Sequence, residues 1–178
     1  MPTSENAGTK EPPSHDRPLR ILIVDDNPDM REMMALMVRR MGYSVATATT
    51  GTEALAHLRA QRADMMLLDL TMPDMDGFEV CRVVQREAAL QPLHIIITSA
   101  RDTLEDKATC FALGAAAYLT KPFGAQELHA RLQVGEHMVR QQPSALDPQR
   151  GSGVNTTKTF CDAQNIESNG LMQVQHIV

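Results

Sequence analysis

The chain has 178 residues, of which 43% are hydrophobic and 22% are charged, a composition typical of a soluble domain with a packed core. Its net charge of -5 argues against a nucleic-acid-binding surface on this chain. The three cysteines are odd in number and lack the spacing of metal ligands, which argues against a disulfide framework and a zinc site. No apolar run is long enough to span a bilayer, so we expect a cytoplasmic protein that contacts no membrane.

Polar segments stand at both ends of the chain. Residues 1–17 are rich in proline and charged side chains without periodicity, and we expect them to form a disordered leader. Residues 143–178 are polar, begin with a proline and are too short for a DNA-binding or catalytic output domain, so we expect a flexible tail. The residues between them, 18–142, are predicted to form one domain.

Five short apolar runs in this domain predict β-strands. Most of them are almost continuously apolar, as in strands that are buried on both faces of a parallel sheet. The run from Tyr43 to Ala48 instead alternates between two faces, so we place it at a sheet edge. The expected strands are Leu19–Val24, Tyr43–Ala48, Met65–Asp69, Leu93–Thr98 and Ala116–Thr120.

A stretch with helical periodicity follows each strand. The first carries a stripe of methionines that we interpret as core packing, and Gly42 is expected to end it. The fourth is expected to have Asp102 as its N-cap and to end at Gly114. The expected core-facing residues are Met30, Met33, Met34, Met37, Val38 and Met41 in the first helix, Ala54, Leu55 and Leu58 in the second, Phe78, Cys81 and Val84 in the third, Leu104, Ala108 and Phe111 in the fourth, and Leu128, Leu132, Gly135 and Val139 in the fifth.

The alternation of five strands with five helices predicts an α/β fold in which helices cover both faces of a parallel sheet. Right-handed crossovers in a doubly wound sheet give the strand order 2-1-3-4-5. The expected edge position of the second strand agrees with that order. Ligands of such sheets bind beyond the carboxyl ends of the strands, at the point where the strand order reverses.

Acidic side chains gather at this predicted point. Asp25 and Asp26 follow the first strand and Asp69 ends the third, while Thr98 and Lys121 end the fourth and fifth strands on the same side. Each residue also has a simpler interpretation: the acids could be helix or turn caps, the threonine an ordinary strand residue and the lysine a solvated loop charge.

Together, these side chains suit phosphoryl chemistry. Each pair of carboxylates about 4 Å apart repels by roughly 4 kcal/mol at an effective dielectric constant of about 20, so a cation is expected among them. Oxygen ligands favour Mg2+, or Mn2+, over zinc. The ammonium of Lys121 and the hydroxyl of Thr98 would stabilise a phosphoryl group, and Asp69 would be the nucleophile because aspartate can form an acyl phosphate.

The motifs Asp25-Asp26, Asp69 with the turn Met72–Gly77, Thr98-Ser99-Ala100 and Lys121-Pro122-Phe123 resemble those of the CheY-like receiver domain of response regulators, the phosphorylated partners in two-component signalling. The resemblance covers about residues 19–137. It implies a flavodoxin-like fold, a cis bond between Lys121 and Pro122, and Mg2+ held by Asp25, Asp26, Asp69 and the backbone carbonyl of Thr71.

The same resemblance implies a function. A sensor histidine kinase or a histidine phosphotransfer protein would phosphorylate Asp69, with Thr98 and Lys121 contacting the phosphoryl group. Thr98 and Tyr118 would then act as switch residues that repack the face formed by the fourth helix, fifth strand and fifth helix. A downstream effector, or a second copy of the chain, would bind that face. The only catalysis implied is Mg2+-dependent self-phosphorylation and autodephosphorylation.

Other functions remain open at this point. The chain could be the regulatory fragment of a multidomain response regulator whose enzymatic or DNA-binding output domain is absent here. A haloacid dehalogenase-type phosphatase also uses an aspartate and Mg2+, but it requires a second aspartate where this chain has Thr71. A receiver-like domain that binds partners without phosphate would not need the complete acidic site.

Overall fold

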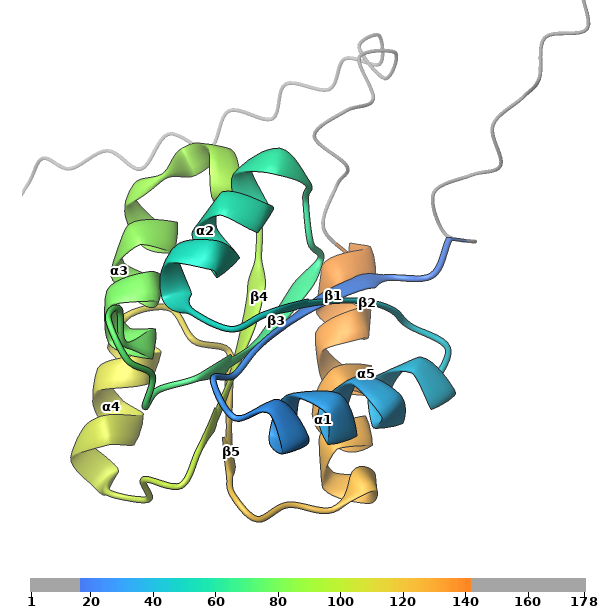
Figure 1. Ribbon diagram of the computed structural model, residues 1–178. Coiled ribbons are helices and arrows are strands. Elements are labelled where there is room, and N and C mark those ends of the chain that lie inside the picture. Colours follow the sequence, from blue (N-terminus) through green and yellow to red (C-terminus); the bar gives the residue numbers. More distant parts are fainter. Residues whose placement is uncertain (1–16, 142–178) are drawn as a thin grey trace, which may run out of the picture. The chain divides into compact units, whose positions relative to one another are not determined.

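The computed structural model describes residues 17–141, so most of the expected leader and the whole expected tail lie outside the described residues. Figure 1 shows strands and helices in strict alternation, as the sequence predicts. The elements are β1 Arg20–Val24, α1 Pro28–Arg40, β2 Ser44–Ala48, α2 Gly51–Ala60, β3 Met65–Asp69, α3 Gly77–Arg86, the 3-10 helix η1 Ala88–Leu90, β4 His94–Ser99, α4 Leu104–Ala112, β5 Ala117–Thr120 and α5 Ala125–Gln141.

The five strands form one parallel sheet in the order β2-β1-β3-β4-β5, which confirms the predicted fold and the edge position of the second strand. Strand order reverses between β1 and β3, the predicted position. Asp69 and Thr98 are register partners on β3 and β4, so their side chains start from neighbouring points at the carboxyl end of the sheet. No helix among residues 17–141 is long and apolar enough to cross a bilayer.

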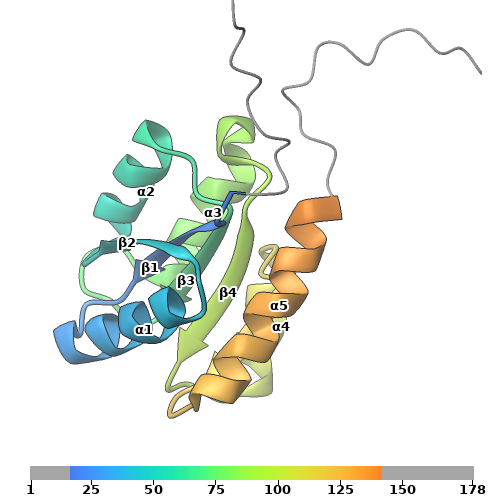
Figure 2. The same cartoon turned by 90° about the vertical axis from the view of Figure 1, so that its right-hand side faces the viewer.

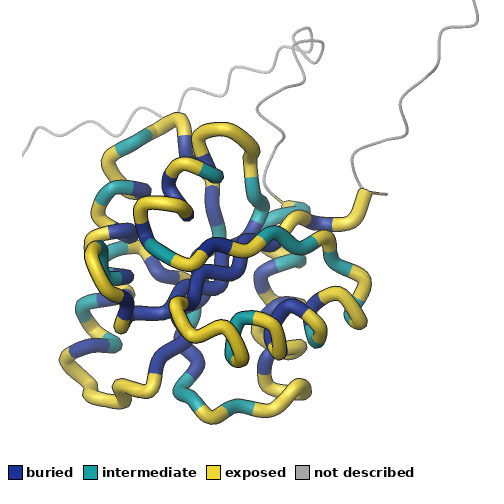
Figure 3. Tube along the Cα trace, viewed as in Figure 1, coloured by how far each residue is buried: buried dark blue, intermediate teal, exposed yellow. Residues whose placement is uncertain are grey.

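Helices cover both faces of the sheet. α1 and α5 pack on one face and α2, α3 and α4 on the other (Figures 1 and 2). Alternate strand residues therefore enter different cores: Met65 and Leu67 face α1 and α5, whereas Met66 and Leu68 face the other three helices. Figure 3 shows buried residues running through the central strands while the outer turns of the helices are exposed. This two-sided burial explains why the central strands are continuously apolar.

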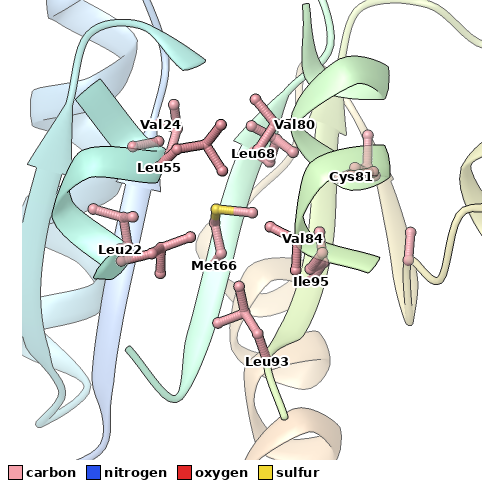
Figure 4. Close-up of a cluster of buried hydrophobic side chains, with 14 of the residues drawn as sticks. Leu22, Val24, Leu55, Met66, Leu68, Val80, Cys81, Val84, Leu93 and Ile95 are labelled. Atoms are coloured by element: carbon pink, nitrogen blue, oxygen red, sulfur yellow. The ribbon is translucent and has the colours of Figure 1, made fainter. Parts of the chain in front are cut away.

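Figure 4 shows the core under α2 and α3. Leu55 of α2 and Val80 and Val84 of α3 meet the strand residues Met66 and Leu68. All these side chains are at most 3% exposed. The predicted core faces of α2 and of the start of α5 are confirmed, and Cys81 and Val84 of α3 are buried as expected.

Short-range polar contacts fix where the helices begin and end. The Asn27 side chain accepts hydrogen bonds from the backbone N–H groups of Asp29 and Met30 and so caps α1. Gly42 has a φ of 92° and ends this helix, as predicted. The Lys121–Pro122 bond is cis, also as predicted, and so is the Gln91–Pro92 bond.

The prediction for α4 was wrong in two respects. Thr103 is its N-cap, because its hydroxyl accepts from the Asp106 backbone N–H. The three expected core residues are exposed, and Asp106 and Cys110 face inward instead. Hydrophobicity alone could not identify this face because a paired carboxylate occupies one of its inner positions. In α1 the methionine stripe is mostly inward, but Met33 is 37% exposed.

Candidate functional site

Three carboxylates meet at the carboxyl end of the sheet. Asp25 directly follows β1, and Asp69 is the last residue of β3. One carboxylate oxygen from each of Asp25, Asp26 and Asp69 lies within 4.8 Å of the others. Asp25 is fully buried and Asp69 is 5% exposed, whereas Asp26 is exposed to solvent. The predicted convergence of the three acids is therefore present.

The predicted basic and hydroxyl side chains join this group. Lys121 follows β5, and its Nζ lies 2.7 Å from Oδ2 of Asp25 and 3.2 Å from Oδ1 of Asp69. Thr98 is fully buried beside Asp69. Its Oγ1 has no hydrogen-bond partner within the described residues, although buried hydroxyls are normally paired. An oxygen-rich ligand that entered the site could supply the missing partner.

The groups around Asp69 have opposite effects on its pKa. Burial is the main cause that raises the pKa of Asp69, and the nearby charge of Asp25 raises it further. The ammonium of Lys121 and the backbone N–H of Thr71 act in the opposite direction. The net pKa is raised, so Lys121 and the Thr71 backbone N–H do not fully offset the burial of Asp69 and the charge of Asp25.

The donors present fit a hard divalent cation. Three carboxylates offer oxygen ligands within a small volume, and one of them is exposed, which leaves room for water as a further ligand. The simpler interpretation of Asp25 and Asp26 as helix caps fails because Asn27 caps α1. Asp25 instead accepts a hydrogen bond of 2.9 Å from the Asn27 backbone N–H, which orients its carboxylate.

The turn after β3 folds closely against Asp69. The backbone N–H of Gly77 donates to the Leu70 carbonyl at 3.1 Å. A Cβ atom at Gly77 would lie only 2.4 Å from the Asp69 carbonyl oxygen, so a larger residue would displace the strand end. Asp76 then begins α3 by accepting from the Glu79 backbone N–H. Gly77 is thus part of what positions Asp69.

Sequence reasoning missed Arg31, which supports the loop after β1. Its Nη1 donates to the carbonyl oxygen of Asp25 at 2.7 Å and lies 3.4 Å from that of Asp26. The loop that carries two of the three carboxylates is therefore held by a side chain from the first turn of α1. The only signal in the sequence is an arginine one helical turn after the cap, Asn27, which is too common to single out.

Tyr118, the predicted switch residue, lies on β5, three residues before Lys121. The residue is 8% exposed, and its hydroxyl donates to the carbonyl oxygen of Arg101 at 2.7 Å. Arg101 belongs to the loop between β4 and α4, three residues after Thr98. Tyr118 is therefore hydrogen-bonded to the loop that follows β4, and its register partner on β4 is Ile97, the neighbour of Thr98.

Comparison with known proteins agrees with this geometry. The family model of the response regulator receiver domain matches residues 21–133. Response regulator MprA of Mycolicibacterium vanbaalenii is 37% identical over 145 residues, which cover 82% of this chain and 59% of that protein. The alkaline phosphatase synthesis transcriptional regulatory protein PhoP of Bacillus subtilis is 36% identical over 114 residues, covering 64% and 47%. The chain thus spans about half the length of the curated relatives it matches.

Solved structures show the same fold. The chemotaxis protein CheY4 of Vibrio cholerae has a TM-score of 0.64 and 33% identity, covering 66% of this chain and 98% of that protein. The receiver domain of a sensor histidine kinase from Pseudomonas aeruginosa, solved with a magnesium ion coordinated in its active-site cleft, has a TM-score of 0.63 and 30% identity, covering 68% and 99%. The doubly wound sheet, its acidic edge and the family match over most of the described residues show that the chain belongs to the response regulator receiver domain family.

Proposed function

We propose that Asp69 is the phosphoacceptor of this receiver domain and that Lys121 and Thr98 stabilise the transferred group. The observation that carries the proposal is the combination around one carboxylate: an ammonium at 3.2 Å and, on the register partner, a buried hydroxyl that lacks a hydrogen-bond partner. Phosphoryl transfer needs positive charge and donors aimed at the equatorial oxygens, and both groups meet that need.

In the proposed reaction, an Asp69 carboxylate oxygen attacks the phosphorus of a phosphohistidine. The new O–P bond forms as the N–P bond breaks, and the imidazole leaves with the bonding electron pair. The hydroxyl of Thr98 donates to a phosphoryl oxygen, and Lys121 shifts its ion pair from the carboxylates toward the new charge. The signal ends by hydrolysis, in which water attacks phosphorus, the bond between phosphorus and the Asp69 oxygen breaks, and inorganic phosphate leaves with the Asp69 carboxylate restored. No other catalytic activity is proposed.

Mg2+ is the proposed cofactor, with Mn2+ as a substitute. Asp25, Asp26 and Asp69 would hold it, together with the backbone carbonyl of Thr71. When bound, such an ion neutralises charge on the carboxylates and on the phosphoryl oxygens. The support is the all-oxygen donor set and the magnesium ion in the Pseudomonas aeruginosa receiver domain.

The proposed partners are a sensor histidine kinase or a histidine phosphotransfer protein upstream and an effector protein downstream. We place the output surface on α4, β5 and α5, where a second copy of the chain could also bind. The two described cysteines, Cys81 and Cys110, are free thiols, in keeping with a cytoplasmic location.

A second candidate is that this sequence is the regulatory part of a longer response regulator. The relatives that support it are transcriptional regulators about twice as long as the matched region. In that case a DNA-binding or enzymatic output domain would act in place of, or beside, a separate effector. The length of the gene product in its organism distinguishes the two candidates.

Incubation of the full chain with acetyl phosphate and Mg2+, followed by intact mass measurement, tests the phosphoacceptor. We expect one added phosphoryl group, lost in Asp69→Asn and when the metal is chelated. Asp74→Asn, which changes a carboxylate in the turn after β3, is the matched control and should be phosphorylated normally. Failure of the folded wild-type chain to gain the group would refute the proposal and favour a receiver that binds partners without phosphate.

A further inference from the structure

The loop after β1 carries two of the three carboxylates, and its backbone is anchored on both sides. Asp25 is the first residue beyond β1 and is fully buried. Its backbone N–H donates to the carbonyl oxygen of Ala48, at the end of the neighbouring strand β2, at 3.3 Å. Its carbonyl oxygen accepts from Nη1 of Arg31 at 2.7 Å, and the carbonyl oxygen of Asp26 lies 3.4 Å from the same nitrogen. One guanidinium on α1 therefore contacts the backbone of both acidic residues.

Arg31 contacts three successive carbonyl groups of this loop. In addition to the carbonyls of Asp25 and Asp26, it reaches that of Asn27, which accepts from the Arg31 backbone N–H at 3.0 Å as in any helical first turn. The side chain of Asn27 caps α1, so the helix does not need the guanidinium in order to begin. What the guanidinium fixes is the path of residues 25–27.

The guanidinium binds the backbone of the loop and not the carboxylates of the site. Within residues 17–141, the ion pairs of those carboxylates are made with Lys121. The charge of Arg31 instead acts on Glu53 of α2, whose pKa is lowered chiefly by hydrogen bonds from Thr49 and further by Arg31. Arg31 thus holds the loop while the carboxylate oxygens remain available to a cation.

Arg31 has two opposite effects on a cation in the acidic site. Its positive charge repels the ion. Its hydrogen bonds hold two ligand residues in place, so less conformational freedom is lost when the ion binds. Mg2+ requires near-ideal octahedral geometry, whereas the larger Ca2+ accepts irregular ligand arrangements, so a fixed loop favours Mg2+ in particular. The two effects predict opposite results when the guanidinium is removed.

We propose that Arg31 is a positioning residue of the metal site, which holds the backbone of residues 25–27 so that the carboxylates of Asp25 and Asp26 are ordered for Mg2+ before the ion binds. This role rests on the proposed function, because it takes the two aspartates as ligands of Mg2+. It assigns the metal affinity, and the preference for Mg2+ over Ca2+, to a side chain that is not itself a ligand. The repulsion is the smaller effect, because Glu53 and the contacted carbonyls partly balance the charge of Arg31.

Titrations of the full chain with MgCl2 and with CaCl2 at constant ionic strength test this role. The backbone amide resonances of residues 69–71 in NMR report the affinity for each ion. The variants are Arg31→Met, which removes the donors and the charge, and Arg31→Lys, which keeps the charge but not the planar fork of donors. Arg39→Met is the matched control, since it changes an exposed arginine in the last turn of α1. Urea titration establishes that each variant is folded, because a buried carbonyl that loses its donor also lowers stability.

We expect Arg31→Met to weaken Mg2+ binding by at least about tenfold and Ca2+ binding by less than about threefold. Arg31→Lys should weaken Mg2+ binding by at least about threefold, because the charge alone does not hold the loop. Arg39→Met should match the wild-type chain for both ions. Unchanged or tighter Mg2+ binding in folded Arg31→Met would overturn the role of Arg31, and so would an equal loss of affinity for the two ions.

The wild-type titration separates the role of Arg31 from the proposed function. Asp26→Asn, which removes a proposed ligand, should weaken Mg2+ binding and shows that the titration reports the acidic site. If the wild-type chain binds Mg2+ and Arg31→Met binds it as tightly, the role of Arg31 fails and the proposed function stands. If the wild-type chain shows no saturable response to Mg2+, the proposed metal site fails, and the role of Arg31 fails with it.

Discussion

Thr98 combines a stability defect with a proposed functional role. Its hydroxyl is buried beside Asp69 without a hydrogen-bond partner, and such a group destabilises a fold by roughly 1–3 kcal/mol. We therefore predict that Thr98→Val, which keeps the branched shape, raises the free energy of unfolding by about 1 kcal/mol in urea titrations. The same change should lower phosphoryl uptake from acetyl phosphate. A loss of stability in Thr98→Val would show that the hydroxyl has a partner in solution.

Gly77 is the second residue whose identity the site requires. An alanine there would place Cβ 2.4 Å from the Asp69 carbonyl oxygen and 2.9 Å from Cα of Leu70, both backbone atoms that move only with the strand end. We predict that Gly77→Ala destabilises the chain by about 1–3 kcal/mol and slows phosphorylation of Asp69. Gly124→Ala is the control, because its Cβ would meet nothing within 4 Å. Equal urea midpoints for the two variants would contradict the prediction.

Site residues at the ends of strands could be predicted from the sequence. Residues that support the loops through long side chains could not. Asp25, Asp69 and Thr98 could be predicted because periodicity locates the ends of strands, and a parallel sheet brings those ends together. Arg31 and Arg101 could not, because each reaches a backbone carbonyl or a carboxylate through a long flexible side chain. Their partners are set by the local fold of a loop, which hydrophobic pattern does not encode.

At the scale of elements, α5 packs on the sheet through a close contact with β4. A Cβ at Gly135 would lie 2.8 Å and 2.9 Å from Cδ2 and Nε2 of His94, the first residue of the strand. The imidazole of His94 therefore packs closely against α5 at Gly135. Its burial disfavours the protonated form and lowers the pKa of His94. This contact lies at the amino end of the sheet, away from the acidic site.

A pH dependence follows from this contact. The folded state favours neutral His94, whereas the unfolded chain takes up a proton near its ordinary pKa of about 6.5. The contribution to stability is therefore complete above about pH 6.5 and is lost as the pH falls below it. We predict that the free energy of unfolding declines as the pH falls from about 6.5 to 5.5, and less steeply in His94→Gln. His129→Gln is the control, because it changes an exposed imidazole on α5, the helix that packs on His94. The stability of this variant should depend on pH as steeply as that of the wild-type chain.

The mistaken face of α4 shows what limits element-level prediction. Leu104 and Phe111 have helical spacing, yet they are 85% and 50% exposed. The inward positions belong to Cys110 and to Asp106, whose charge is neutralised by Arg101. A hydrophobic stripe predicts the buried face only when no ion pair competes for it and no partner requires apolar residues outside. On α2 neither complication arises, and its stripe was predicted correctly.

At the scale of the whole domain, strand order was the most predictable feature. It follows from the alternation of strands and helices, right-handed crossovers and one alternating edge strand, all of which survive errors in individual helix faces. The sequence pattern does not determine which surface binds a partner, because exposed apolar residues occur on α1 as well as on α4 and α5. The two faces of the sheet therefore have to be compared directly, through a residue on α1 and a residue on α4.

Matched substitutions test the proposal that a second copy of the chain binds the surface formed by α4, β5 and α5. Phe111 on α4 and Leu36 on α1 are each 50% exposed, and the two helices cover opposite faces of the sheet. We predict that Phe111→Ser weakens self-association at least about tenfold in sedimentation equilibrium, whereas Leu36→Ser leaves it unchanged, because a buried aromatic anchor dominates such contacts. Association that is lost in Leu36→Ser and kept in Phe111→Ser would assign the interface to α1.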